Sequence, residues 1–187
     1  VAGYTFIGLP LPFLPLQILF LNLVTDVFPA LALGMGSGND SVMKEQPRNP
    51  KEPILTRQLW TSIGAYGAAI TLSVLGVALY CDRWLALDKE VTNNVTFLSL
   101  TLAQLWHVFN ITSARLSFIT NDITRNVYVW LALLLCIVIV AIAYLVEPFH
   151  TVLSLTHLSF EYWEIILIGS LLPVLIIQLL KRLKLVW

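Results

Sequence analysis

An acidic residue lies in the middle of an apolar stretch that runs over residues 16–34. The stretch is long enough to cross a bilayer, which takes about 20 apolar residues. Near its centre it carries Asn22, Thr25 and Asp26. A carboxylate at this depth costs about 2.5–3.5 kcal/mol on insertion scales. Because the stretch contains no Lys or Arg, Asp26 needs a proton, a residue on another helix or a bound cation as its partner.

The spacing of these polar residues fits a cation site. In a helix, Asn22 and Asp26 lie one turn apart on one face, with Thr25 beside them. Pro29 has no amide hydrogen, so the carbonyl of Thr25, four residues earlier, loses its helical hydrogen bond. A carboxylate, an amide oxygen, a hydroxyl and a free carbonyl are ligands that hard cations such as Ca²⁺ prefer. The alternative is a kinked helix whose polar residues only stabilise packing against neighbouring helices.

The composition is that of an integral membrane protein whose main partner is the lipid bilayer. Of the 187 residues, 58% are hydrophobic and 12% are charged, against roughly 25% charged residues in soluble domains. The mean hydropathy is +0.82. Acidic and basic residues balance at 11 each, and no basic patch with interleaved aromatic residues indicates a nucleic-acid partner. The cysteines, Cys81 and Cys136, indicate neither a disulfide framework nor a metal cluster.

Apolar segments predict an all-α, multi-pass membrane protein with five full transmembrane helices. The spans are expected at about residues 16–34, 58–80, 95–111, 127–146 and 162–180. Residues 1–9 are apolar but too few to cross a bilayer, and prolines follow them. We therefore expect them to be the tail of a truncated helix, and residues 1–187 to be one membrane domain of a larger protein. The almost purely aliphatic span at 127–146 is interpreted as a lipid-facing scaffold.

The third predicted span is the second polar one. Thr101, Gln104 and His107 recur every three residues, close to one helix face. Gln104 lies near the centre of the span, at roughly the depth expected for Asp26. It fits either an amide that lines the ion site or a hydrogen-bonding residue between helices. His107 is expected to be a hydrogen-bonded interior residue, because no second His or Cys is spaced to bind a metal with it.

The basic residues predict an orientation in the membrane. Nine of the 11 lie in or beside the segments 35–56 and 112–126 or in the C-terminal tail. The other two, Arg83 and Lys89, lie on the opposite side. Because basic residues favour the cytosolic side, both segments and the C-terminus are expected in the cytosol.

Two motifs resemble a known family. The sequence NLVTD at residues 22–26 and the sequence PRNPKEP at residues 47–53 are similar to the sixth transmembrane helix and following cytosolic loop of P-type cation-transporting ATPases. Within that family the calcium-pump group is the most similar. The resemblance covers the whole chain, from the end of the fifth helix through the tenth. It implies the C-terminal, ion-binding membrane part of an ATP-driven pump, with Ca²⁺ as the favoured ion.

The resemblance also implies roles for single residues. Asn22 and Asp26 would coordinate the ion, and Thr25 would contribute to a second site. Calcium pumps of the reticulum type have a Glu in the eighth helix as a further ligand. Gln104 stands at that position here, which implies a single ion site or a different cation. The remaining ligands are expected from the fourth and fifth helices of the same pump, because Ca²⁺ takes 6–8 oxygen ligands.

The segment 35–56 would contact the phosphorylation domain of the same pump and relay its state to the membrane. The sequence contains neither a DKTGT-type phosphorylation motif nor a P-loop. The fragment is therefore expected to be part of a translocating ATPase whose ATP and Mg²⁺ bind only in cytosolic domains outside it. Other functions stay open: a secondary carrier or channel with Asp26 as a protonatable relay, a pump for Na⁺, H⁺ or another hard cation, or a structural bundle.

Overall fold

A computed structural model describes residues 13–35, 53, 55–111 and 122–186. All regular elements in these ranges are helical, which confirms the all-α prediction. In chain order they are α2 (Pro15–Asn22), η1 (Leu23–Val27), α3 (Phe28–Gly34), α4 (Arg57–Leu79), η3 (Tyr80–Trp84), α5 (Lys89–His107), η4 (Val108–Asn110), α6 (Asp122–Arg125), α7 (Val127–Leu145), α8 (Glu147–Val152) and α9 (Phe160–Arg182). The helix tail expected at residues 1–9 and most of the segment 35–56 lie outside the described residues.

Four helical segments of the described chain are long and apolar enough to cross a membrane. They are Pro15–Gly34, Arg57–Trp84, Val127–Leu145 and Phe160–Arg182, and each overlaps a predicted span. The remaining predicted span, 95–111, corresponds to α5 and η4. α5 is not among the four, because it carries many polar side chains along its length. The count of five spans therefore stays a prediction.

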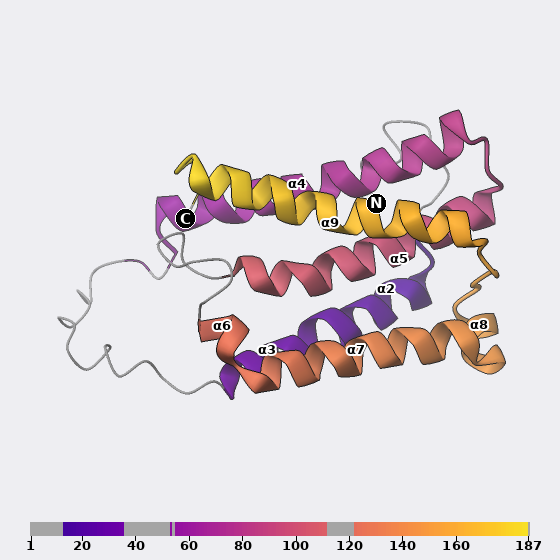
Figure 1. Ribbon diagram of the computed structural model, residues 1–187, viewed down its shortest axis with the longest axis horizontal. Helices are drawn as coiled ribbons and strands as arrows, with labels where there is room; N and C mark the ends of the chain where they lie inside the picture. The colour runs from indigo at the N-terminus through magenta and orange to yellow at the C-terminus, as the bar shows by residue number, and fades with distance from the viewer. Residues whose placement is uncertain (1–12, 36–52, 54, 112–121, 187) are drawn as a thin grey trace.

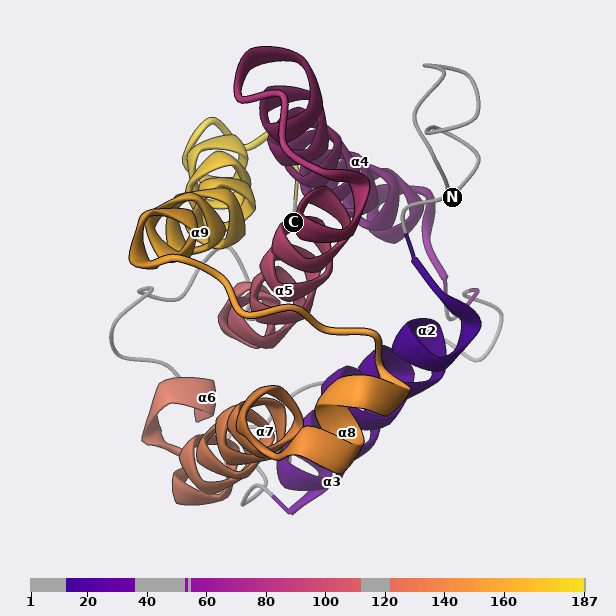
Figure 2. The same ribbon diagram turned by 90° about the vertical axis from the view of Figure 1, so that its right-hand side faces the viewer.

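The helices form two groups (Figure 1, Figure 2). α4, α5 and α9 pack against one another, while α7 packs along α3 and η1. α5 also contacts η1, so it lies where the two groups meet. This central position explains how so polar a helix is accommodated in an apolar bundle, since protein rather than lipid surrounds its polar side chains.

Some buried polar side chains of α5 make their hydrogen bonds within the helix itself. Its buried polar side chains are Thr92, Asn94, Thr96, Ser99 and Thr101. The hydroxyls of Thr96 and Thr101 donate to carbonyls one turn earlier, at 2.6 and 2.8 Å. Such back-bonding lets a threonine lie inside a helix bundle without a partner on another helix.

A glycine allows α9 to approach both of its neighbours closely. A Cβ added at Gly169 would overlap Cγ2 of Val77 on α4 and would lie 3.6 Å from the hydroxyl oxygen of Ser99 on α5. Small residues at helix contacts are a main source of packing between membrane helices, because they bring the backbones together. Gly169 therefore marks a close contact of the three-helix group that a mutation can test.

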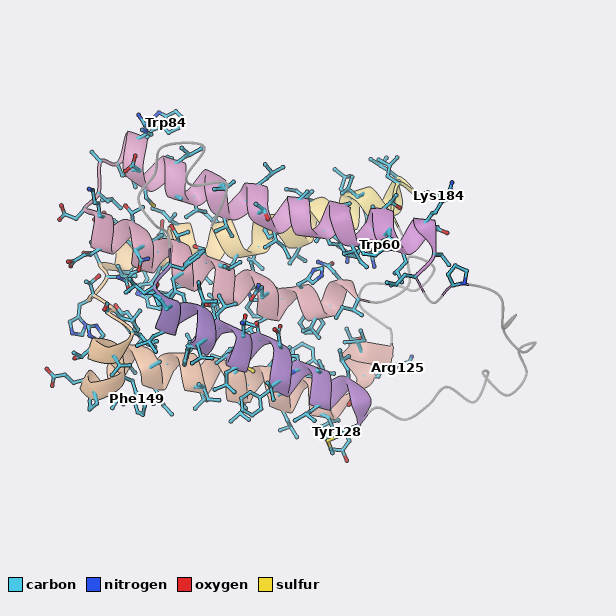
Figure 3. The ribbon with its side chains drawn as sticks, turned by 180° about the vertical axis from the view of Figure 1, so that it is seen from behind. Trp60, Trp84, Arg125, Tyr128, Phe149 and Lys184 are labelled. Carbon is cyan, nitrogen blue, oxygen red and sulfur yellow. The ribbon has the colours of Figure 1, made fainter. Side chains whose placement is uncertain are left out.

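Basic residues gather at one end of the bundle. Figure 3 shows Arg125 and Lys184 near one end, and Trp84 and Phe149 near the other. Trp60 lies toward the basic end, so large aromatic residues occur near both ends, as is typical of membrane–water interfaces. The end that carries the basic residues is the one predicted to face the cytosol, and this orientation stays a prediction.

α7 is more than a lipid-facing scaffold. Its exposed face carries aliphatic side chains such as Leu131 and Leu134, but its first residues also hold α3. The side chain of Asn126 accepts a hydrogen bond from the amide of Tyr128 at 2.9 Å and donates one to the carbonyl of Ala32 at 3.1 Å. Carbonyls in the last turn of a helix lack intrahelical donors. Asn126 therefore caps the start of α7 and the end of α3 together.

Replacing Asn126 by Ala is expected to lower the free energy of unfolding by about 1–2 kcal/mol, because both caps are lost. The measurement is thermal unfolding of the full-length protein in detergent. Asn126→Asp keeps the acceptor for Tyr128 but cannot donate to Ala32, so it should lose only part of this stability. Equal melting temperatures for Asn126→Ala and the unsubstituted protein would contradict the double cap.

Candidate cation-binding site

The predicted site lies in a π-helical turn, η1, which separates α2 from α3. In such a turn the amide of residue i+5 donates to the carbonyl of residue i, and these turns are frequent at functional sites. Pro29 lies in the first turn of α3. Without an N–H it can donate neither to Thr25, four residues earlier, nor to Val24, five residues earlier. The proline predicted to kink the span therefore accompanies a widened turn that leaves two neighbouring carbonyls without this donor.

The three polar side chains of the turn differ in exposure. Thr25 is buried, and its hydroxyl donates to the carbonyl of Leu21 at 2.9 Å and lies 3.4 Å from Oδ1 of Asp26. Asn22 and Asp26 are exposed with respect to the described residues. Four residues apart, they share one helix face. A carboxylate on such a face is costly next to lipid, so this face is suited to a cation or to further protein.

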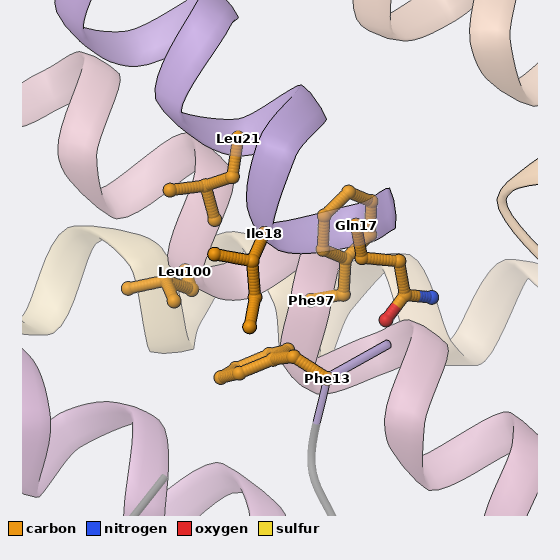
Figure 4. Close-up of a pocket in the computed structure, with 6 residues that line it drawn as sticks. All are labelled: Phe13, Gln17, Ile18, Leu21, Phe97 and Leu100. Atoms are coloured by element: carbon orange, nitrogen blue, oxygen red, sulfur yellow. The ribbon is translucent and has the colours of Figure 1, made fainter. Parts of the chain in front are cut away.

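α5 runs parallel to α2, and three pairs of side chains fix its register. Gln17 donates to Asn93 at 2.9 Å, the rings of Phe20 and Phe97 lie 6.2 Å apart, and Leu21 and Leu100 line one pocket (Figure 4). Following this register one turn further places Gln104 level with Thr25. The depth expected for Gln104, near that of Asp26, stays a prediction.

The side chain of Gln104 has an unmet hydrogen-bonding requirement. Its Oε1 is buried and has no hydrogen-bond partner among the described residues. A buried acceptor left unpaired costs about 1–3 kcal/mol, so each such group needs an explanation. Other buried polar atoms of α5, such as Oγ of Ser99, are also unpaired within the described residues, so both interpretations of Gln104 stay open.

His107 lies inside the bundle, as the sequence predicts, but its environment is mainly aromatic. Its ring meets the ring of Tyr66 edge to face at 5.4 Å. Nδ1 of His107 is buried without a hydrogen-bond partner within the described ranges, so the expected hydrogen bond is not found for that atom. In the same ranges no group of three or more His, Cys, Asp or Glu side chains could hold a metal ion. The candidate ligands are therefore a single carboxylate with amide, hydroxyl and carbonyl oxygens.

One residue beside the turn was missed by the sequence analysis. Cys136 of α7 is fully buried, and its thiol donates to the carbonyl of Val24 at 3.1 Å. Nothing in the aliphatic sequence around Cys136 indicates this contact. Pro29 is no signal of it either, because it removes the donor of Thr25 in an α-helix and that of Val24 only in the π turn.

The architecture and the turn define a class of protein: a helical membrane protein with a polar, proline-associated turn inside one of its spans. Residues 10–183 match the model of the family described as "Cation transporting ATPase, C-terminus", and the chain belongs to this family. This confirms the resemblance to P-type cation-transporting ATPases that the motifs indicated.

Several relatives are named calcium-transporting ATPases. The chain is 31% identical over 180 residues to the calcium-transporting ATPase of Bacillus subtilis (strain 168), covering 95% of this chain and 20% of the relative. It is 28% identical over 192 residues to calcium-transporting ATPase 1 of Bacillus cereus (strain ATCC 10987 / NRS 248), covering 95% of this chain and 22% of the relative. The chain thus spans about a fifth of the length of these curated relatives.

Proposed function

We propose that this chain is the membrane-embedded ion-binding part of an ATP-driven cation pump, and that the transported ion is Ca²⁺. The observation that carries the proposal is the π turn, where the carboxylate of Asp26 lies on one face with Asn22 in a span with no basic residue. Membership of the family supports the pump, and the names of the relatives support Ca²⁺.

Each candidate ligand has a distinct task in this proposal. Asp26 supplies the negative charge that replaces part of the hydration of the ion, and Asn22 adds a neutral oxygen one turn earlier. Thr25 can offer its main-chain carbonyl, to which Pro29 cannot donate, while its hydroxyl donates to the carbonyl of Leu21. Gln104 can offer an amide oxygen from α5.

This set is too small for Ca²⁺, which takes 6–8 oxygens. The fourth and fifth helices of the same pump would supply the remaining ligands and further negative charge. Since Gln104 is neutral, it adds no charge for a second divalent ion, which favours a single ion site. ATP and Mg²⁺ would bind in the cytosolic domains of the parent protein, and the segment 35–56 would contact the phosphorylation domain.

The proposal is tested by measuring the ATPase activity of the full-length protein over a panel of Ca²⁺, Mg²⁺, Mn²⁺, Na⁺ and K⁺. Stimulation by Ca²⁺ is expected, and Asn22→Ala should raise the Ca²⁺ concentration for half-maximal activity by about tenfold, the effect of losing roughly 1.4 kcal/mol of binding. Thr71→Ala, at an exposed position on α4, is the control and should leave this concentration unchanged.

Two results would count against the proposal. Activity that no cation stimulates would exclude a cation pump. Stimulation by Ca²⁺ that is equally strong in Asn22→Ala would place the ion elsewhere. Stimulation by a different hard cation, with the same dependence on Asn22, would keep the pump and replace Ca²⁺ as its ion.

A further inference from the structure

We infer that Cys136 is a positioning residue for the cation site: its thiol holds the Val24 carbonyl and thereby the π turn that presents Asn22 and Asp26. The inference rests on the proposed function and extends it to α7, a helix of apolar side chains that offers the ion no carboxylate or amide ligand. Cys136 would act through the main chain of η1, without touching the ion.

The contact itself is short and fully enclosed. Sγ of Cys136 lies 3.1 Å from the carbonyl oxygen of Val24, and both residues are completely buried. Water therefore does not compete for the carbonyl, and a buried carbonyl without a donor is unfavourable. The thiol is a weak donor, but it is the donor that the structure gives to this oxygen.

The π turn explains why Val24 needs a donor from another helix. In the π pattern the amide of Phe28 is directed to the carbonyl of Leu23, and the donor for Val24 would be residue 29. Residue 29 is a proline and has no N–H. Pro29 is also the fourth residue after Thr25, so it cannot make the α-helical hydrogen bond to the Thr25 carbonyl. Cys136 satisfies the carbonyl of Val24, whose π-pattern donor would be the proline.

A second hydrogen bond from the start of α7 also holds the segment that follows the π turn. α7 runs antiparallel to α3, and the amide of Asn126 binds the carbonyl of Ala32 at the far end of the same segment. Asp26 lies between Val24 and Ala32 in the chain. Both contacts are made to backbone carbonyls, so they fix the main chain around Asp26 rather than any one side chain.

Loss of the π turn would change the direction of the ligands. A π turn inserts one residue into the helical path, and closing it to α-helix turns the preceding segment by about 100° relative to α3. The face that carries Asn22 would then turn away from its present direction relative to α3. A weaker hold on Val24 should therefore reduce ion affinity, with little effect on the steps that follow once the site is saturated.

The test is the Ca²⁺ dependence of ATPase activity in the full-length protein. Cys136→Ala is expected to raise the Ca²⁺ concentration for half-maximal activity by about threefold to tenfold and to leave the maximal rate at saturating Ca²⁺ nearly unchanged. Cys136→Ser keeps a donor and should restore most of the affinity. Cys81→Ala is the matched control, because Cys81 is equally buried but lies in η3, away from the turn.

A second pair of variants separates the hydrogen bond from packing. Thr and Val have nearly the same shape, but only Thr carries a donor. Cys136→Thr should therefore keep more Ca²⁺ affinity than Cys136→Val, even if Cys136→Ala does not fold. Equal affinity in these two variants, an unchanged affinity in Cys136→Ala, or an equal loss in Cys81→Ala would overturn the inference.

The outcome for Cys136 can be told apart from the outcome for the pump. If Asn22→Ala weakens Ca²⁺ stimulation and the Cys136 variants do not, the positioning role fails and the proposed function stands. If no cation stimulates the unsubstituted protein, both fail.

Discussion

Asp26→Asn in the full-length protein is expected to abolish cation-dependent phosphorylation by ATP while the protein remains folded in the membrane. Asn keeps the size of the side chain and removes its charge. Losing one partner of a desolvated charge pair costs about 2–5 kcal/mol, or roughly 30-fold to 4,000-fold in affinity. The measurement is phosphoenzyme formation from labelled ATP as a function of Ca²⁺ concentration.

A matched carboxylate controls for the removal of a charge. Glu164 is an exposed acid in the first two turns of α9, and Glu164→Gln should leave the cation dependence unchanged. Unchanged cation dependence in Asp26→Asn would contradict the candidate site. The two other functions predict different results: a secondary carrier forms no phosphoenzyme at all, and a purely structural bundle tolerates Asp26→Leu without loss.

Gly169→Ala is expected to lower the free energy of unfolding of the membrane part by about 1–3 kcal/mol, the usual effect of overpacking. The added methyl group would overlap Cγ2 of Val77. Val77 is β-branched and stiff about χ1 in a helix, so its methyl groups cannot turn away. The measurement is thermal unfolding of the membrane part, followed in the full-length protein in detergent.

Two further variants make this prediction specific. Val77→Ala removes the atoms that the new methyl group meets, so the double variant should recover part of the stability that Gly169→Ala loses. Gly67→Ala is the matched control on α4, because a Cβ there has nothing within 4 Å and Ala favours the helix over Gly. Equal melting temperatures for Gly169→Ala and Gly67→Ala would contradict the close contact.

The sequence predicted the apolar helices well and the polar helix less well. The bounds of α7 were predicted to within one residue, because an aliphatic run is limited by Asn126 on one side and Glu147 on the other. The start of α5 was placed at residue 95, whereas the helix begins at Lys89. Residues 89–94 are polar except for Val91 and lie outside the predicted apolar span, but packing at the centre of the bundle makes them helical. Tertiary contacts of this kind override local pattern.

The candidate site likewise contains residues that the sequence makes evident and one residue that it does not. Asn22, Thr25, Asp26 and Pro29 stand out because they are polar or helix-breaking within an apolar run. Cys136 does not stand out, because its role depends on which face α7 turns toward η1 and on a carbonyl that only the π turn exposes. A residue whose partner is a main-chain oxygen on another helix leaves no periodic signal in the sequence.

The widened turn joins two half-helices that are fastened to different neighbours. α2 is tied to α5 through Gln17 and Asn93, and α3 is tied to α7 through Ala32 and Asn126. Because Cys136 of α7 also holds the Val24 carbonyl, a displacement of α2 and α5 against α3 and α7 would be taken up between Asn22 and Val24. In the proposed pump, such a displacement would move Asn22 relative to Asp26 and so change the oxygens offered to the ion.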